Sequence, residues 1–153
     1  MATLLILYHS QTGNTQKMAE AVMRGAMEIE HARVVIKKAL DATYEDLTGC
    51  DGIVIGSPEY FGYMAGAIKD FFDRTYEKAR NDQPIRKKPF AIFISAGNDG
   101  QGALTHIERI CKGYQFKKAH QPVISKGPVM REILRECEEL GRIMAAGCEA
   151  GIF

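Results

Sequence analysis

The stretch LLILYHSQTGNTQKMAEAV, residues 4–22, decides the fold that we predict for this chain. It opens with a short apolar run, breaks into Ser-Gln-Thr-Gly-Asn-Thr, and then resumes with apolar residues at helical spacing, at Met18, Ala21 and Val22. This pattern predicts a buried strand, a tight loop and an amphipathic helix. The loop carries three hydroxyl groups and neither lysine nor arginine, so what it binds is the first question that the sequence raises.

The rest of the chain alternates strand and helix in the same way. Apolar runs predict further strands at residues 33–36, 52–55, 90–95 and 122–125, and helical stripes occupy residues 18–29, 64–72 and 130–148. Parallel strands need crossovers, which are usually helical, so this order predicts an α/β fold. We expect one domain, residues 1–153, with a five-stranded parallel sheet and helices on both faces. The polar stretch 74–88 is predicted to be a helix end and an exposed loop.

Composition restricts the class of protein. The chain has 153 residues, of which 46% are hydrophobic and 25% charged, and its formal net charge is +1. That balance gives no support to a nucleic-acid partner. The four cysteines lie far apart without metal-ligand spacing, which favours a reduced, cytoplasmic setting with no metal. No apolar run approaches ~18 residues and a strand begins at once, so we expect neither a membrane span nor a signal peptide.

The first loop has the chemistry of a phosphate-binding loop. Backbone N–H groups at the start of a helix are unpaired and lie at the positive end of its dipole, so they attract an anion. Ser10, Thr12 and Thr15 can add hydroxyl donors, and Gly13 can take a positive φ. The loop matches neither the Walker A sequence nor the Gly-x-Gly-x-x-Gly fingerprint. An ordinary turn with N-cap residues would look similar.

Two more unusual loops follow strands three and four, at the sheet edge where open α/β folds bind ligands. The loop SPEYFGYMAG places Tyr60, Phe61 and Tyr63 in a predicted turn, which suggests a flat ring to stack on, although the rings could instead cover the sheet end. The glycine-rich loop AGNDGQG lets the backbone approach a ligand closely but offers no aromatic ring. The loops after strands two and five are expected to be plain connections.

These motifs resemble those of a known family. SQTGNT is similar to the Ser/Thr-x-Thr-Gly-x-Thr phosphate loop of flavodoxin-like proteins. GSPEYFGYMAGAIKDFFDR resembles the matching segment of NAD(P)H:quinone oxidoreductases related to the tryptophan-repressor-binding protein. The resemblance spans nearly the whole chain. It implies a flavodoxin-like three-layer sandwich with strand order 2-1-3-4-5, an order known for flavodoxin itself, and flavin mononucleotide (FMN) as cofactor.

The resemblance also implies which residues bind the cofactor. Residues of the first loop would hold the phosphate, those of the second would flank the isoalloxazine ring, and those of the third would line its pyrimidine side. His106 resembles a position near the open face of the ring in the quinone reductases, and it is the candidate catalytic residue; a solvent-facing polar side chain is the alternative. The implied FMN contacts are Ser10, Gln11, Thr12, Gly13, Asn14, Thr15, Pro58, Glu59, Tyr60, Phe61, Gly62, Ser95, Ala96, Gly97, Asn98, Asp99 and Gly102.

Two functions fit the same cofactor. Flavodoxin-type carriers of single electrons are usually strongly acidic, with a second aromatic ring in the fourth-strand loop, and this sequence departs from both features. An uncovered ring face suits hydride transfer, so we favour an NAD(P)H-dependent FMN oxidoreductase that reduces quinones or similar small acceptors. A one-electron carrier is the alternative. The expected partners are a small-molecule acceptor or a redox protein, with association of identical subunits also open.

A phosphoacceptor receiver domain would share the strand order. It needs an acidic pair after strand one and an aspartate at the end of strand three. This chain has His9-Ser10 and Ser57-Pro58 there, and Lys126 after strand five is too weak a signal alone. The sequence therefore disfavours a receiver.

Overall fold

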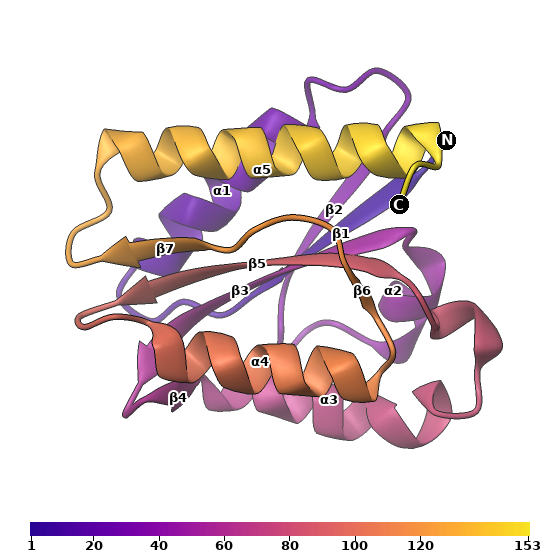
Figure 1. Cartoon of the computed structure of the whole chain (residues 1–153), viewed down its shortest axis with the longest axis horizontal. Helices are drawn as coiled ribbons and strands as arrows, with labels where there is room; N and C mark the ends of the chain where they lie inside the picture. The colour runs from indigo at the N-terminus through magenta and orange to yellow at the C-terminus, as the bar shows by residue number, and fades with distance from the viewer.

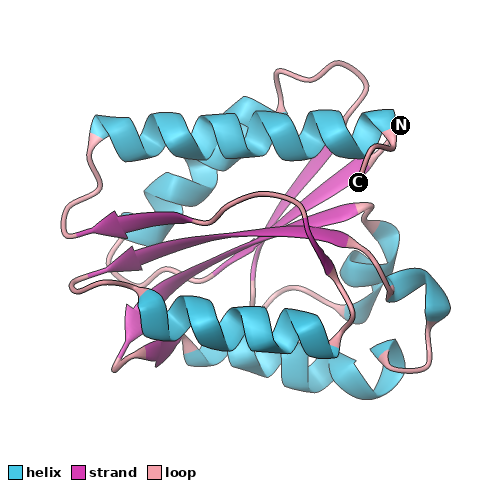
Figure 2. Cartoon of the chain, viewed as in Figure 1, coloured by secondary structure: helices cyan, strands magenta, loops and turns pink.

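The structure is a computed structural model that describes residues 1–153. A twisted sheet forms the middle layer, with helices above and below it (Figures 1 and 2). Five positions across the sheet run in the order β2-β1-β3-β5 and then β6 with β7, all parallel. This confirms the predicted flavodoxin-like order. The strands are β1 (Thr3–Tyr8), β2 (Arg33–Lys38), β3 (Gly52–Tyr60), β4 (Tyr63–Met64), β5 (Pro89–Ala96), β6 (Lys117–Lys118) and β7 (Val123–Lys126).

The helices cover both faces of the sheet. One apolar cluster joins the sheet to α1 and α5, and the other joins it to α2, α3 and α4. Figure 1 shows α1 and α5 above the sheet, and α3 and α4 below it. The helices are α1 (Asn14–Ala26), α2 (Tyr44–Gly49), α3 (Gly66–Ala79), the 3-10 helix η1 (Gln83–Ile85), α4 (Gln101–Gly113) and α5 (Arg131–Ala150). No helix is both long and apolar enough to cross a bilayer.

Strand β3 is longer than predicted. The prediction ended it at residue 55, because polar residues and a proline follow, whereas β3 continues to Tyr60 and turns back into β4. The turn therefore consists of Phe61 and Gly62 alone, and Tyr60 and Tyr63 face each other across the hairpin. Ser57 holds this extension in place, since its hydroxyl accepts a hydrogen bond from the backbone N–H of Ala65 at 2.9 Å.

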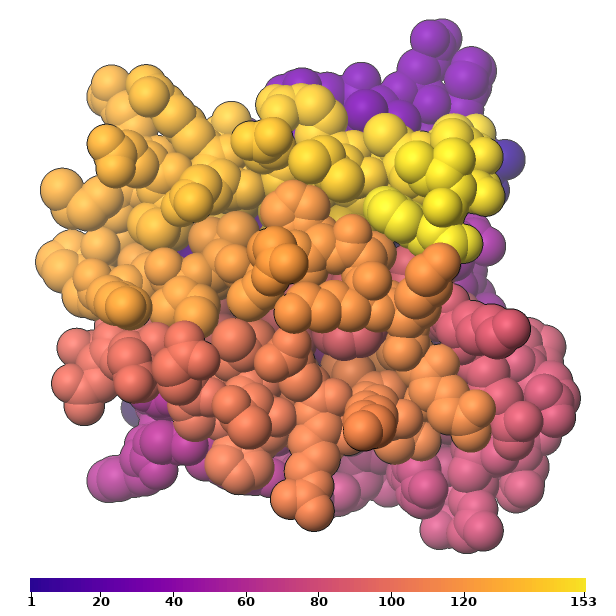
Figure 3. All heavy atoms as spheres, in the orientation of Figure 1, coloured from indigo at the N-terminus to yellow at the C-terminus, as the bar shows by residue number.

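The fifth position of the sheet is divided. β6 pairs with the start of β5 and β7 pairs with its end, and residues 119–122 separate the two short strands. The space-filling view shows this segment in orange, crossing the face between α5 and α4 (Figure 3). Pro122, which has no N–H to give a neighbouring strand, precedes β7. Strand pairing resumes at Val123, opposite Phe93.

Helices α1 and α5 touch backbone to backbone. A Cβ placed on Gly25 would lie 1.8 Å from the carbonyl oxygen of Glu138, and one on Gly141 would lie 1.9 Å from that of Val22. Only glycine permits this approach from both sides. The contact brings α1, which begins directly after the first loop, against α5.

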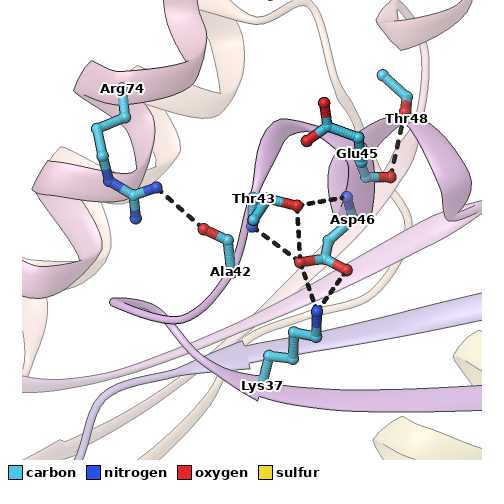
Figure 4. Close-up of polar contacts among 7 residues, drawn as sticks. All are labelled: Lys37, Ala42, Thr43, Glu45, Asp46, Thr48 and Arg74. Atoms are coloured by element: carbon cyan, nitrogen blue, oxygen red, sulfur yellow. Dashed lines mark hydrogen bonds and ion pairs between the residues drawn. The ribbon is translucent and has the colours of Figure 1, made fainter.

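The short helix α2 was not predicted. Thr43 and Asp46 form a reciprocal capping box at its start, and the Lys37 ammonium lies 2.8 and 2.9 Å from the two Asp46 carboxylate oxygens (Figure 4). Arg74 of α3 donates to the carbonyl of Ala42 just before it, at 3.0 Å. Burial alone would raise the pKa of Asp46, but the hydrogen bonds from Lys37 and Thr43 outweigh it and hold that pKa below its usual value.

The stretch 74–88 is a helix end and a loop, as predicted, but the loop is not wholly exposed. Ile85 and Lys88 are buried, and the Lys88 ammonium donates to the carbonyl of Cys50.

The cysteines pack as small apolar side chains. Burial raises the pKa of both Cys50 and Cys148 to about 11, so neither is a ready thiolate.

Candidate functional site

The first loop is held open by its own serine. Gly13 takes a φ of 105° just before α1, and the Ser10 hydroxyl accepts hydrogen bonds from the N–H groups of Gly13 and Gln16, both at 3.2 Å. Ser10 therefore caps the N-terminus of α1 from the start of the loop. Its side chain supports the loop and is not among those that line the cavity described below.

The loop presents a set of donors that the protein itself does not use. The backbone N–H groups of Thr12, Asn14 and Thr15 donate to no protein acceptor. They lie at the N-terminus of α1, where the helix dipole is positive. No lysine or arginine lines the cavity beside them. An anion there would be bound by dipoles and hydroxyl groups alone.

A buried pair of hydroxyl groups joins the first loop to the end of β5. The Thr15 and Ser95 hydroxyl oxygens are 2.8 Å apart, and both residues are buried. Two hydroxyl groups carry two hydrogens and only one lies between the oxygens, so the other is free to be donated elsewhere. The pair therefore still has a donor to offer, although both residues are almost fully buried.

The β3–β4 hairpin forms a second wall. Phe61 and Gly62 have φ values of 52° and 73°, the combination of a type I′ turn. A phenylalanine in this conformation is strained, and Phe61 is 107% exposed. The Tyr60 ring meets His9 edge-on at 6.3 Å, and its hydroxyl donates to the Gln11 side chain at 3.3 Å. Tyr60 therefore bridges the hairpin and the first loop.

A cavity of about 200 Å³ lies between these walls. Ten of its residues were predicted from the sequence, and Gly127, in the loop after β7, was not. That loop is more than a plain connection, because the Gly127 N–H donates to the carbonyl of Ala96 at 2.7 Å and folds back over the end of β5. The lining residues are Gln11, Thr12, Asn14, Thr15, Pro58, Glu59, Tyr60, Ser95, Ala96, Gly97 and Gly127.

The other predicted contacts lie around the cavity. Asn98 and Asp99 are exposed in the loop after β5, and Asp99 accepts a hydrogen bond from the N–H of Gln101 at 3.0 Å. Gly102 serves as packing: a Cβ there would lie 2.0 Å from the carbonyl oxygen of Gly62. The Glu59 carboxylate accepts from the N–H of Ala103 at 3.0 Å. The hairpin and the start of α4 thus form one unit.

His106 belongs to this unit and does not line the cavity. Its ring packs on Tyr63 with centroids 4.7 Å apart, and its Nδ1 lies 2.6 Å from the Gly102 carbonyl oxygen. Nδ1 therefore carries a hydrogen if this contact is a hydrogen bond, and only Nε2 is left for another partner. A catalytic role for His106 stays a prediction.

His9 is the titratable group at the start of the first loop. Burial lowers its pKa below the usual 6.5, and the positive charge of Lys38 lowers it further. At pH 7 and above, the imidazole beside Tyr60 is therefore mainly neutral. His9 therefore adds no positive charge beside the cavity at this pH.

Comparison with known proteins identifies the family. Residues 3–126 match the model of a family described as NADPH-dependent FMN reductase. This chain belongs to that family. A flavodoxin from Aquifex aeolicus is 30% identical over 161 residues, which cover 95% of this chain and 86% of that protein. An NAD(P)H dehydrogenase (quinone) from Acidithiobacillus ferrooxidans is 33% identical over 127 residues, covering 70% of this chain and 63% of that relative, so the match spans less than two thirds of it.

Solved structures show the fold of this FMN reductase family member. An archaeal flavodoxin superimposes with a TM-score of 0.81 at 23% identity, covering 96% of this chain and 99% of that one. A WrbA-like flavodoxin from Agrobacterium tumefaciens gives 0.82 at 19% identity, covering 98% and 99%. A flavodiiron core from Synechocystis gives 0.83 at 22% identity, with 98% of this chain matching 36% of that one. The flavodoxin-like fold is thereby established.

Proposed function

We propose that this chain binds FMN in the cavity at the carboxyl end of the sheet and acts as a redox flavoprotein. One observation carries the proposal: the unpartnered N–H groups of Thr12, Asn14 and Thr15, which suit a phosphate monoester. The donor set fits the group, because the Thr15 and Ser95 hydroxyls retain a hydrogen to donate. Membership of the FMN reductase family supports the same cofactor.

The other walls suit a flat, polar-edged ring. Tyr60 supplies an aromatic face, while the N–H groups of Gly97, Asn98 and Asp99 donate to no protein acceptor and could serve ring oxygens and nitrogens. Bound FMN would supply the electron and hydride chemistry. The protein would bind the phosphate, orient the ring between the hairpin and the loop after β5, and leave part of the ring accessible.

Within this function we favour an NAD(P)H-dependent reductase of quinones or similar small acceptors. The loop after β5 contains no aromatic residue, its residues 97–99 are exposed, and a Cβ on Gly97 would meet no atom within 4 Å. One side of the ring would therefore be open to a nicotinamide (NADH or NADPH) and then to an acceptor. The NAD(P)H dehydrogenase relative supports this assignment.

A one-electron carrier is the second candidate. It is favoured by the Aquifex flavodoxin, since that match covers most of both chains. A carrier would pass electrons to a redox protein, with the exposed Phe61 of the β3–β4 hairpin as an apolar contact. Both candidates share the cofactor site and differ in what approaches it.

An anaerobic titration separates the two. The protein is reconstituted with FMN, then treated with NADH or NADPH, and finally with dithionite, while the visible flavin spectrum is followed. We expect prompt bleaching by a nicotinamide and reoxidation by benzoquinone. Reduction by dithionite alone, in two one-electron steps, would contradict the reductase assignment and support the carrier. Failure to retain FMN at all would contradict both.

A further inference from the structure

Ser125 is a buried hydroxyl without a partner, one strand away from the cofactor site. Its side-chain oxygen has no hydrogen-bond partner in the structure, and the residue is 0% exposed. A buried hydroxyl that makes no hydrogen bond loses its hydration without compensation. Ser125 lies near the end of β7, next to the candidate ligand site, so its unpaired hydroxyl needs a physical reason.

The position of Ser125 opposite Ser95 supplies this reason. Ser125 pairs in register with Ser95 across the parallel strands β7 and β5. Each lies two residues after a member of the core that faces α1 and α5, Val123 and Phe93 respectively, so both side chains lie on that face. Adjacent strands are about 4.8 Å apart, and a serine hydroxyl has three staggered positions. Rotation about χ1 can thus direct the Ser125 hydroxyl at Ser95.

We propose that Ser125 is a positioning residue for the cofactor phosphate, the first donor in a chain of three hydroxyl groups. In the loaded protein Ser125 donates to Ser95, Ser95 donates to Thr15, and Thr15 donates to the phosphate. This order uses all three hydrogens and points every dipole toward the anion, an arrangement in which each bond strengthens the next. The inference rests on the proposed FMN site.

The chain explains why the unpartnered hydroxyl is kept. Without an anion, the hydrogen between Thr15 and Ser95 can point either way, since either oxygen can donate. Ser125 then makes no hydrogen bond, and its burial lowers the stability of the free protein. With Thr15 donating to an anion at the first loop, Ser95 must donate toward Thr15, which leaves both of its lone pairs free and makes its oxygen a stronger acceptor for Ser125. The cost in the free protein is offset in the complex.

The test is Ser125→Ala, with affinities for FMN and for riboflavin, which lacks the phosphate, and with the melting temperature of the apoprotein. We expect the FMN dissociation constant to rise about two- to tenfold, the factor that one hydrogen bond contributes. Riboflavin affinity stays unchanged. The apoprotein melts at the wild-type temperature or above it, because a buried unpaired group has been removed. A purely structural role predicts a lower melting temperature and equal losses for both ligands, which would overturn the inference.

Two further variants sharpen the result. Val123→Ala removes apolar volume from the same face of the same strand, and it should lower the melting temperature without changing the ratio of FMN to riboflavin affinity. In a Ser95→Ala background, Ser125→Ala should cause no additional loss of FMN affinity, because the chain is already broken. Additive losses would contradict a chain. A wild-type protein with equal affinity for FMN and riboflavin would overturn the proposed phosphate site as well, whereas a ratio of FMN to riboflavin affinity that Ser125→Ala leaves unchanged overturns only this inference.

Discussion

Thr12 and Thr15 differ in what they contact, although both lie in the first loop. Thr12 is exposed and lines the cavity, whereas Thr15 is buried and shares a hydrogen bond with Ser95. Thr12→Ala should weaken FMN binding by about 1–3 kcal/mol, as expected for losing a hydrogen bond to a charged group, and should leave apoprotein stability and riboflavin affinity unchanged. Thr15→Ala should reduce both FMN affinity and stability, since it leaves Ser95 without its partner.

Isothermal titration calorimetry with both ligands and thermal melts of both apoproteins measure this difference. Equal effects of the two substitutions on stability would contradict the assignment of Thr15 to a buried pair. Riboflavin losses as large as those for FMN would show that the threonines do not act on the phosphate.

The pH response of His9 follows from its surroundings. Its pKa lies below 6.5 because of burial first and Lys38 second. Between that lowered value and the value in the unfolded chain, the unfolded chain binds more protons. The contribution of His9 to stability is therefore fully present above the unfolded pKa and is lost as the pH falls toward the folded one. Lys38→Gln should raise the pKa toward 6.5 without reaching it, as followed by the imidazole proton shifts in NMR. An unchanged pKa would exclude Lys38 as a cause.

At the scale of single residues, sequence reasoning predicted ten of the residues that line the cavity, but not which residues support the loops and which face the ligand. The first loop was recognisable because three hydroxyls and a glycine stand between a strand and a helical stripe, although an ordinary capped turn looks similar, and the resemblance to the flavodoxin phosphate loop decided between them. Gly127 could not be found, since a glycine in a short connection gives no signal until β7 is placed beside β5. The support role of Ser10 and the contact of Gly102 with Gly62 likewise depend on distances that only the folded chain supplies.

The contact between helices α1 and α5 gives a prediction at the scale of elements. Gly25→Ala should destabilise the protein by about 1–3 kcal/mol or more, because the added methyl group would overlap the Glu138 carbonyl of the facing helix. Gly49→Ala is the matched control: it ends α2, has no atom within 4 Å of the added carbon, and should stabilise slightly. Urea unfolding curves measure both. A tolerated Gly25→Ala would mean that α1 can move away from α5.

The element predictions succeeded where apolar periodicity is strong and failed where pairing across the fold decides. Strands β1 and β5 and helix α5 follow their patterns. β3 runs past Pro58 because that residue pairs with Ser95 in register and because the hairpin continues the strand. Helix α2 has six residues, too few for a periodic stripe, and only the Thr43 and Asp46 cap signals it. In both cases contacts distant in sequence override local preference.

At the scale of the whole molecule, the strand order brings three loops that are distant in sequence to one edge. The first loop, the hairpin and the loop after β5 meet there because β1, β3 and β5 are neighbours. The alternation of strand and helix predicted the layers and the parallel sheet. The order of the strands came from resemblance, since periodicity alone does not rank strands within a sheet.

The absence of lysine and arginine from the cavity lining determines how FMN affinity depends on ionic strength. Counterions screen long-range attraction between charges, but they hardly affect short hydrogen bonds from fixed backbone groups. FMN affinity should therefore change little between dilute and concentrated sodium chloride, and a steep loss would mean that a cation outside the cavity holds the phosphate. If loading is constant, any effect of salt on turnover or electron delivery arises at the encounter with the donor or acceptor. Sodium chloride then becomes a probe of the partner alone, applied to a protein whose cofactor stays in place.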